Sequence, residues 1–407
     1  MSIYIGIDCS EQKHDVVFLN EAGVIIGQLE MSHTPAGLLN LEKTRRYLGI
    51  CREECLVALE TAHTLVIDFL WAQAYPQIYV IPPSVIKSCR GRYGQSEARD
   101  DRKDGRLIAD VLRTDRARLQ PWLPDSLLTQ QMRAKVSFIN HLTRQSVRWS
   151  NRLRAILLRY YPLALDIFTS LKHQITLHFI LTYPTPQAAT ALTFKEFKHF
   201  AFEHGYRSHA KKLPQRFARL QQPYPTASPD TVQVYQAEVV VLARFLLQLL
   251  QSKKQALGEL QALFDQHPDR DIFASLPGAG PFLAPALLSK FGDDRARFAT
   301  AASLQALAGT CPVTDKSGKR KRVKFRRACD REFRWLVQQW AISSLKQSIW
   351  ANGYWHQVRP RCGSDNHAYR CLGNRWLAIA WKLWQSSQTY DETYHFRQRA
   401  LRSKPRA

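Results

Sequence analysis

Four carboxylates are candidate ligands for a metal ion: Asp8, Glu60, Asp101 and Asp104. Asp8 and Glu60 each follow a run of apolar residues typical of a buried strand. The chain has a net charge of +24 and a pI of about 9.9. Acidic groups gathered in such a chain repel one another unless a cation holds them, and carboxylates are the ligands that hard divalent cations prefer. We therefore expect these residues to bind one or two divalent ions, with Mg²⁺ as the first choice.

A hydroxyl lies within the most basic stretch of the chain. Ser317 and Gly318 fall in a run that holds ten Lys or Arg residues: 316, 319, 320, 321, 322, 324, 326, 327, 331 and 334. A serine so surrounded has the means to attack a phosphate while cations stabilise the developing charge. A plain Ser-Gly turn in a basic loop fits the same pattern, and the residues alone favour that turn.

Two further features suggest contacts with a phosphate backbone. One is a stripe of arginines that a helix would place on one face: Arg133, Arg144, Arg148, Arg152 and Arg159. The other is the turn that contains Gly278 and Gly280, which resembles one helix-hairpin-helix element and would let backbone N–H groups approach a phosphate. A solvated helix face explains the stripe equally well, and an ordinary interhelical turn would explain the glycines.

The elements that must position these residues differ along the chain. Residues 3–7, 15–19, 24–30, 55–60 and 78–81 are predicted strands, and residues 39–47 and 64–74 are predicted helices. This order predicts a mixed α/β sheet with Asp8 and Glu60 at strand ends that open into one cleft.

The chain after Pro121 is predicted to be helical. Asp125 or Ser126 caps a helix that runs to about residue 161, and a second long helix covers residues 232–264. The long helices are expected to pair, either with each other or with another subunit. The predicted domains are 1–120, 121–268 with an insertion at 163–229, 269–390, and a basic tail at 391–407. Most tryptophans of the third domain are assigned to its core.

The composition is that of a globular protein of two or three domains, and its charge favours nucleic acid as the partner. No apolar run approaches the ~20 residues of a membrane helix, which favours a cytosolic protein. The cysteines are scattered. Cys51 lies near Cys55 and Cys362 near Cys371, but neither pair has zinc-site spacing with matching partners, so reduced thiols are expected.

Five motifs in order make the chain similar to the DEDD-type transposases of the insertion-sequence one-ten family. They are Gly6-Ile7-Asp8-x-Ser10, Leu59-Glu60-x-Ala62, Asp101-Arg-Lys-Asp104-Gly, Leu276-Pro-Gly-x-Gly-Pro281, and Ala308-Gly309-x-x-Pro312 followed by Ser317-Gly-Lys. The resemblance covers nearly the whole chain. It implies an RNase H-like (RuvC-like) N-terminal domain, long coiled-coil-like central helices and a mostly helical C-terminal domain.

The resemblance also implies roles for individual residues. Asp8, Glu60, Asp101 and Asp104 become the metal-binding tetrad, and Ser317 the nucleophile that joins covalently to a DNA end. The residues implied to contact nucleic acid include the arginine stripe, the two glycines and a set from the basic run: Lys319, Arg320, Lys321, Arg322, Lys324, Arg326, Arg327 and Arg334. Asp100 remains a rival of Asp101, because both lie on the same helical side as Asp104.

The resemblance implies double-stranded DNA and a non-coding bridge RNA as partners, in a homodimer or a dimer of dimers whose site is completed between subunits. Two other functions stay open. In a RuvC-like nuclease or junction resolvase, water would replace Ser317 as the attacking group. In a non-catalytic nucleic-acid-binding protein, the tetrad would have no function.

Overall fold

The computed structural model describes residues 2–62, 64–93, 101–168, 170–225, 227–318 and 320–394, with the backbone alone for residues 92, 93, 101–103 and 208. The chain divides into two compact units, residues 1–124 and 125–407. Asp100 and Lys319, both named above, lie outside the described residues. The division of the second unit at residue 268 stays a prediction.

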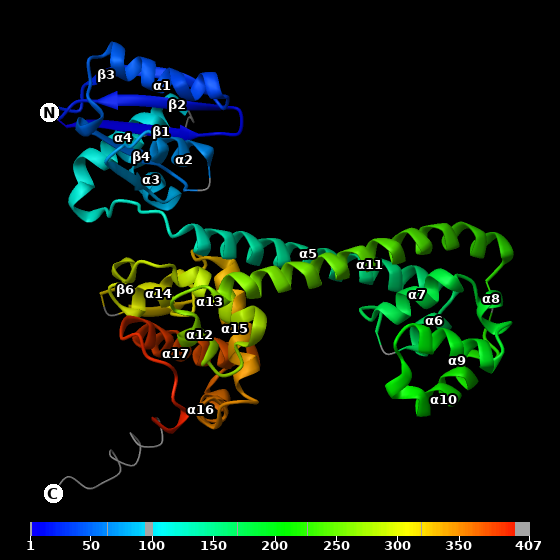
Figure 1. Cartoon of the computed structure of the whole chain (residues 1–407). Helices are drawn as coiled ribbons and strands as arrows, with labels where there is room; N and C mark the ends of the chain where they lie inside the picture. Colours follow the sequence, from blue (N-terminus) through cyan, green and yellow to red (C-terminus); the bar gives the residue numbers. More distant parts are fainter. Residues whose placement is uncertain are drawn as a thin grey trace, which may run out of the picture. The chain divides into compact units, whose positions relative to one another are not determined.

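The first unit is built on one five-stranded sheet (Figure 1). Its strands are β1 (Ile3–Cys9), β2 (Lys13–Leu19), β3 (Ile25–Ser32), β4 (Cys55–Leu59) and β5 (Gln77–Val80), in the order β3-β2-β1-β4-β5. The pairs β1–β2 and β2–β3 are antiparallel, whereas β1–β4 and β4–β5 are parallel. The predicted mixed sheet is confirmed, and each observed strand end lies within two residues of the predicted one.

Strand alternation sends the side chains of this sheet into two cores. Ile5, Ile7 and Val57 belong to the core beneath α1 (Pro35–Tyr47) and α2 (Leu65–Ala72). Tyr4 and Ala58 belong to the opposite core, which α4 (Asp101–Asp115) and α3 (Pro83–Cys89) complete. Residues at every second position after Tyr4 in β1 and after Ala58 in β4 therefore also face α4.

In the described part of the second unit, the regular elements are helices and one hairpin, β6 (Val313–Ser317) with β7 (Arg320–Lys324). Two long helices, α5 (Leu127–Tyr160) and α11 (Pro229–Asp265), pack along each other, as Figure 1 shows. Ser126 accepts a hydrogen bond from the Thr129 N–H and caps α5 as predicted. The paired long helices are confirmed.

Each end of the α5–α11 pair carries its own hydrophobic cluster. One cluster lies where α5 ends and α11 begins, and we call it the end cluster. It includes Leu153, Tyr160 and Leu246, and five short helices cover it. These are α6 (Leu163–Ile167), α7 (Gln174–Thr182), α8 (Pro186–Thr190), α9 (Phe194–Glu203) and α10 (Leu213–Leu220). Among the described residues α11 is the single helix long and apolar enough to cross a membrane; its packing on α5 and α7 buries part of that apolar surface.

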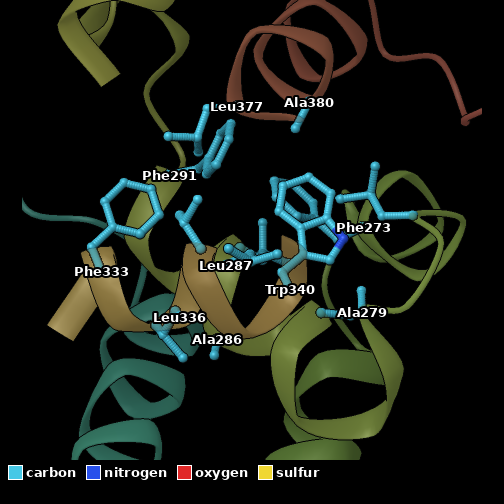
Figure 2. Close-up of a cluster of buried hydrophobic side chains, with 14 of the residues drawn as sticks. Phe273, Ala279, Ala286, Leu287, Phe291, Phe333, Leu336, Trp340, Leu377 and Ala380 are labelled. Atoms are coloured by element: carbon cyan, nitrogen blue, oxygen red, sulfur yellow. The ribbon is translucent and has the colours of Figure 1, made fainter. Parts of the chain in front are cut away.

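The other end carries the C-terminal core. Its helices are α12 (Arg270–Ala274), α13 (Gly280–Phe291), α14 (Ala301–Leu307), α15 (Arg331–Ser344), α16 (Ile349–Val358) and α17 (Asp365–Gln385). Figure 2 shows Phe273 of α12, Leu287 of α13, and Phe333 and Trp340 of α15 converging in this core. Trp340, Trp376 and Trp384 are completely buried, which confirms the prediction that tryptophans of this region belong to the core.

Candidate active site

The parallel pair β1–β4 brings two of the predicted carboxylates to one edge of the sheet. Asp8 is the penultimate residue of β1, and Glu60 directly follows β4. The pairing Ile7 with Leu59 aligns the ends of the two strands. Because side chains alternate, Asp8 and Glu60 continue the series that faces α4. The sheet therefore presents both carboxylates on the same face.

Helix α4 brings Asp104 to that face. The helix begins at Asp101, and Asp104 follows three residues later, about one turn along. It crosses β1 at Gly6, where a Cβ atom would lie only 2.1 Å from the Gly105 carbonyl oxygen and 2.4 Å from the Ala109 nitrogen. Glycine at position 6 thus allows the helix to lie against the strand next to Asp8.

The electrostatics of these carboxylates indicate mutual proximity. Burial raises the pKa of Glu60, and the negative charge of Asp104 raises it further, while Arg90 acts in the opposite direction. Arg90 forms a 2.7 Å ion pair with Asp104. Burial also raises the pKa of the Cys9 thiol to about 11; a hydrogen bond with Thr64 opposes this rise, and the charges of Asp8 and Glu60 add to it. Asp8, Glu60 and Asp104 therefore form one acidic group, in which Arg90 is a source of positive charge.

The sequence prediction missed a fifth carboxylate at this edge. Asp15 on β2 lies directly opposite Asp8 in the antiparallel register, and it is buried. Opposite residues of an antiparallel pair share a face, so Asp15 also lies on the α4 side of the sheet. The available signal was the predicted hairpin itself, since a tight connection between the two strands sets this register.

Ser317 occupies the last position of β6, at the turn of the hairpin. The sequence indicated a Ser-Gly turn in a basic loop, and the structure gives a regular antiparallel ladder in which Ser317 pairs with Arg320. Gly318 has a φ of 53°, the left-handed value that two-residue hairpin turns require at this position. Both strands are exposed along their whole length. The hydroxyl is therefore open to a large substrate.

The ladder sorts the charged residues of the hairpin by face. Ser317, Asp315 and Val313 lie on one face, with Arg320, Arg322 and Lys324 opposite them. The other face carries Lys316 and Lys321. Lys324 forms a 2.6 Å ion pair with Asp315. Ser317 consequently shares its face with Arg320 and Arg322, whereas Lys321 points to the opposite side.

Two arginines hold the base of the hairpin to the C-terminal core. The guanidinium of Arg334 lies 4.4 Å from the ring centroid of Phe325, and that of Arg370 lies 4.7 Å from it. Arg334 also donates to the carbonyl oxygen of Arg326 and to the Cys329 sulfur. In this structure Arg334 supports the hairpin from within the protein.

The predicted nucleic-acid contacts on α5 have different environments. Arg144, Arg148 and Arg159 are exposed, and Arg148 lies 5.5 Å from the Trp149 ring. Arg152 pairs with Glu238 of α11 at 2.8 Å. Arg133 forms a 2.6 Å ion pair with Asp125 and donates to the carbonyl oxygen of Ser289, so it joins α5 to α13. The stripe thus combines exposed cations with residues that hold helices together.

The glycine turn before α13 is explained by packing. Gly278 has a φ of 75° and is buried, and its N–H donates to the side chain of Gln347 at 2.7 Å. A Cβ atom at this position would meet the backbone of α15 within 2.7 Å. In this structure the N–H contacts Gln347, and the close approach of α15 requires the glycine; a phosphate contact at this turn stays a prediction. Gly280, at the start of α13, is exposed.

Comparisons with known proteins match both units of the chain. A family model described as a transposase, the DEDD type of IS110 elements, covers residues 5–162. A second, the transposase IS116/IS110/IS902 family, covers residues 270–356. The first match contains Asp8, Glu60, Asp101 and Asp104, and the second contains Ser317.

Several relatives align over nearly the whole chain. The mini-circle transposase assigned to IS117 of Streptomyces coelicolor is 28% identical over 97% of each chain. An uncharacterized protein of insertion element IS116 of Streptomyces clavuligerus is 26% identical over 95% of this chain and 96% of its own. A protein of insertion element IS900 of Mycobacterium paratuberculosis is 23% identical, over 95% and 97%. With both family models matching in order, this chain belongs to the IS110 family of transposases.

Proposed function

We propose that this transposase cuts and rejoins DNA strands with two groups of residues. A tetrad of Asp8, Glu60, Asp101 and Asp104 holds divalent metal, and Ser317 forms a covalent link to DNA. The observation that carries the proposal is the hairpin: it ends in an exposed serine directly opposite an arginine, in a chain of a transposase family.

The acidic group supports the metal half of the proposal. The strand order β3-β2-β1-β4-β5, with Asp8 and Glu60 at the ends of two adjacent parallel strands, fits an RNase H-like domain. The donors are carboxylate oxygens, which suit Mg²⁺; burial, together with the nearby charge of Asp104, raises the pKa of Glu60. A bound Mg²⁺ supplies Lewis acid chemistry to the scissile phosphate. Asp8, Glu60, Asp101 and Asp104 would hold the ion, and Asp104 would then bind metal in place of its ion pair with Arg90.

The hairpin supports the covalent half. The Ser317 Oγ forms a bond to phosphorus, the bond from phosphorus to a deoxyribose oxygen breaks, and that oxygen leaves as a hydroxyl after gaining a proton. The serine proton passes to water or to a nearby base. Arg320 and Arg322 share the face of the attacking oxygen and stabilise the charge that develops on the phosphate. Attack by a DNA hydroxyl on the phosphoserine reverses these steps and conserves the bond energy for rejoining.

A bridge RNA and double-stranded DNA are the proposed partners. The net charge of +24, the basic hairpin and the exposed arginines of α5 support binding to two polyanions. In the proposed assembly, a homodimer or a dimer of dimers, Ser317 of one subunit completes the metal site of another.

The deciding experiment detects the covalent link. The protein is incubated with Mg²⁺, RNA transcribed from the DNA that flanks its gene and labelled DNA; denaturing electrophoresis and peptide mapping follow. Wild type should give an adduct on Ser317, Ser317→Ala none, and Ser317→Cys a trace, because a thiolate attacks phosphorus with different geometry. RNA binding by Ser317→Ala should equal that of wild type.

Other outcomes identify the alternatives. Cleavage without any adduct would support a nuclease that uses water. Recombination by Ser317→Ala at the wild-type rate would exclude this serine. Recombination by Asp8→Ala, Glu60→Ala and Asp104→Ala at the wild-type rate would support a protein whose tetrad has no catalytic function.

The two faces of the hairpin provide a matched pair of variants. Arg320→Ala removes the cation opposite Ser317, whereas Lys321→Ala removes the same charge from the other face. Losing one preorganised donor to a transition state typically slows a reaction about 100-fold or more. We expect adduct formation to slow by that factor in Arg320→Ala and by less than about tenfold in Lys321→Ala. Equal effects would indicate that the hairpin contributes net charge alone.

A further inference from the structure

Two thiols and an imidazole meet at the N-terminal end of α17. The sulfur atoms of Cys362 and Cys371 and a ring nitrogen of His367 all lie within 4.8 Å of one another. The sequence prediction rejected this cysteine pair because no ligand spacing was recognised. The missed signal was His367, four residues before Cys371, which a helix places on the same face.

Local hydrogen bonds hold the backbone at Cys362 and His367. The Ser364 side chain caps α17 by accepting from the N–H of His367. Cys362 lies in the preceding turn, where its N–H donates to the Arg359 carbonyl at 3.1 Å and its own carbonyl accepts from the Arg359 guanidinium at 3.2 Å. Arg359 also pairs with Asp365 in the first turn of α17. The turn that contains Cys362 and the start of α17, which carries His367, are thus both hydrogen-bonded segments.

We propose that Cys362, His367 and Cys371 bind a zinc ion. Two thiolates and an imidazole are a donor set that selects zinc, whereas the oxygen ligands of the acidic group suit Mg²⁺. Tetrahedral zinc with Zn–S bonds of about 2.3 Å separates two sulfurs by about 3.8 Å. The two sulfur atoms lie within 4.8 Å of each other, so zinc binding requires them to move closer by about 1 Å at most. His367 is exposed, so water has access to the fourth coordination position.

The zinc ion ties together segments that support the serine hairpin. It joins the turn after α16 to the first two turns of α17. From those turns Arg370 lies over Phe325 at the hairpin base, and Asn366 bonds to Gln338 of α15 at 2.9 Å. One turn further, the side chain of Asn374 accepts a hydrogen bond from Thr310, which precedes β6. Zinc binding thereby stabilises the helix on which the base of the hairpin rests.

The test uses the full-length protein with cobalt as a spectroscopic probe. After metal removal under reducing conditions, titration with Co²⁺ should give a thiolate-to-metal charge-transfer band that Zn²⁺ bleaches. The carboxylates of the acidic group have no sulfur, so they cannot produce this band. Elemental analysis of protein purified from cells grown with added zinc should find about one equivalent of zinc per chain, bound through these residues.

Three variants make the test specific. His367→Ala removes an exposed side chain, so it should fold normally while its Kd for zinc rises by at least about tenfold. Cys371→Ser should lose about half the charge-transfer intensity, because one of two thiolates remains. Cys51→Ser, which removes an exposed cysteine of the first unit, should behave as wild type.

Stability gives a second readout. A chelator should lower the melting temperature of the wild type and leave that of His367→Ala unchanged, since bound metal stabilises the folded state alone. The proposal is overturned if the wild type shows no charge-transfer band, or if His367→Ala binds zinc as tightly as wild type. A Cys362–Cys371 disulfide in protein isolated under reducing conditions would overturn it as well.

Discussion

Replacing Gly6 by alanine should separate the acidic residues of β1 from those of α4. The new Cβ would lie 2.1 Å from the Gly105 carbonyl oxygen, where an ordinary carbon–oxygen contact needs about 3.3 Å. The two nearest atoms, the Gly105 oxygen and the Ala109 nitrogen, belong to the backbone of α4, so no flexible side chain can move aside. Helix α4 must therefore move by about 1 Å, and Asp104 moves with it, away from Asp8.

This displacement has two expected magnitudes. Overpacking of a tight contact costs about 1–3 kcal/mol, which hydrogen exchange should detect as faster opening of β1 and α4. A shift of about 1 Å in catalytic groups can cost about 100-fold in rate, and we expect DNA cleavage by Gly6→Ala in Mg²⁺ to fall by that factor. DNA binding should persist, because the hairpin and the α5 arginines belong to the second unit.

Gly258→Ala is the matched control. A Cβ atom at Gly258 in α11 would meet nothing within 4 Å, and alanine favours helix by about 1 kcal/mol over glycine. This variant should cleave like wild type and unfold no more easily. The reasoning is refuted if Gly6→Ala also exchanges and cleaves like wild type, since the helix would then not be held against the strand.

Two further perturbations test the charge distribution. Burial alone would raise the pKa of Glu42, but hydrogen bonds from Arg45, Tyr75 and Arg52 hold it at about 2, against 4.5 for a free glutamate. The resulting stability, about 3 kcal/mol, is complete above pH 4.5 and lost as the pH falls toward 2. Hydrogen exchange of α1 in wild type and Glu42→Gln should therefore differ at pH 6 and converge near pH 2; a constant difference would contradict this origin. For DNA binding, neutralising about six phosphates predicts a slope of log affinity against log salt of roughly −5, and a flat response would contradict the basic-surface interpretation.

The sequence predicted the parts of the site that depend on local pattern. Strand alternation and strand ends were sufficient to bring Asp8 and Glu60 together, because the side-chain period of a strand is fixed. The cap at Ser126 set the start of α5. These predictions needed no knowledge of the neighbouring elements.

The features that the sequence did not predict depend on contacts between distant segments. Gly278 had the appearance of a phosphate-binding turn, because the sequence does not show that α15 packs against it. Asp15 is an exception: its position opposite Asp8 follows from the register of the local β1–β2 hairpin, which the sequence indicated. His367 was missed for a different reason: its helical spacing to Cys371 was visible, but Cys362 approaches through a turn that only the fold reveals.

The lengths of the paired helices α5 and α11 set the distance between the C-terminal core and the end cluster. The 34 residues of α5 span about 51 Å, and the chain leaves the C-terminal core along α5 and returns along α11. Lys135 pairs with Glu259 toward one end, and Arg152 pairs with Glu238 toward the other. Removing one heptad from each helix between these ion pairs would shorten the separation by about 10 Å and rotate the end cluster by only about 20°. The distance from the C-terminal core to the end cluster can thus be changed without altering the hairpin that carries Ser317.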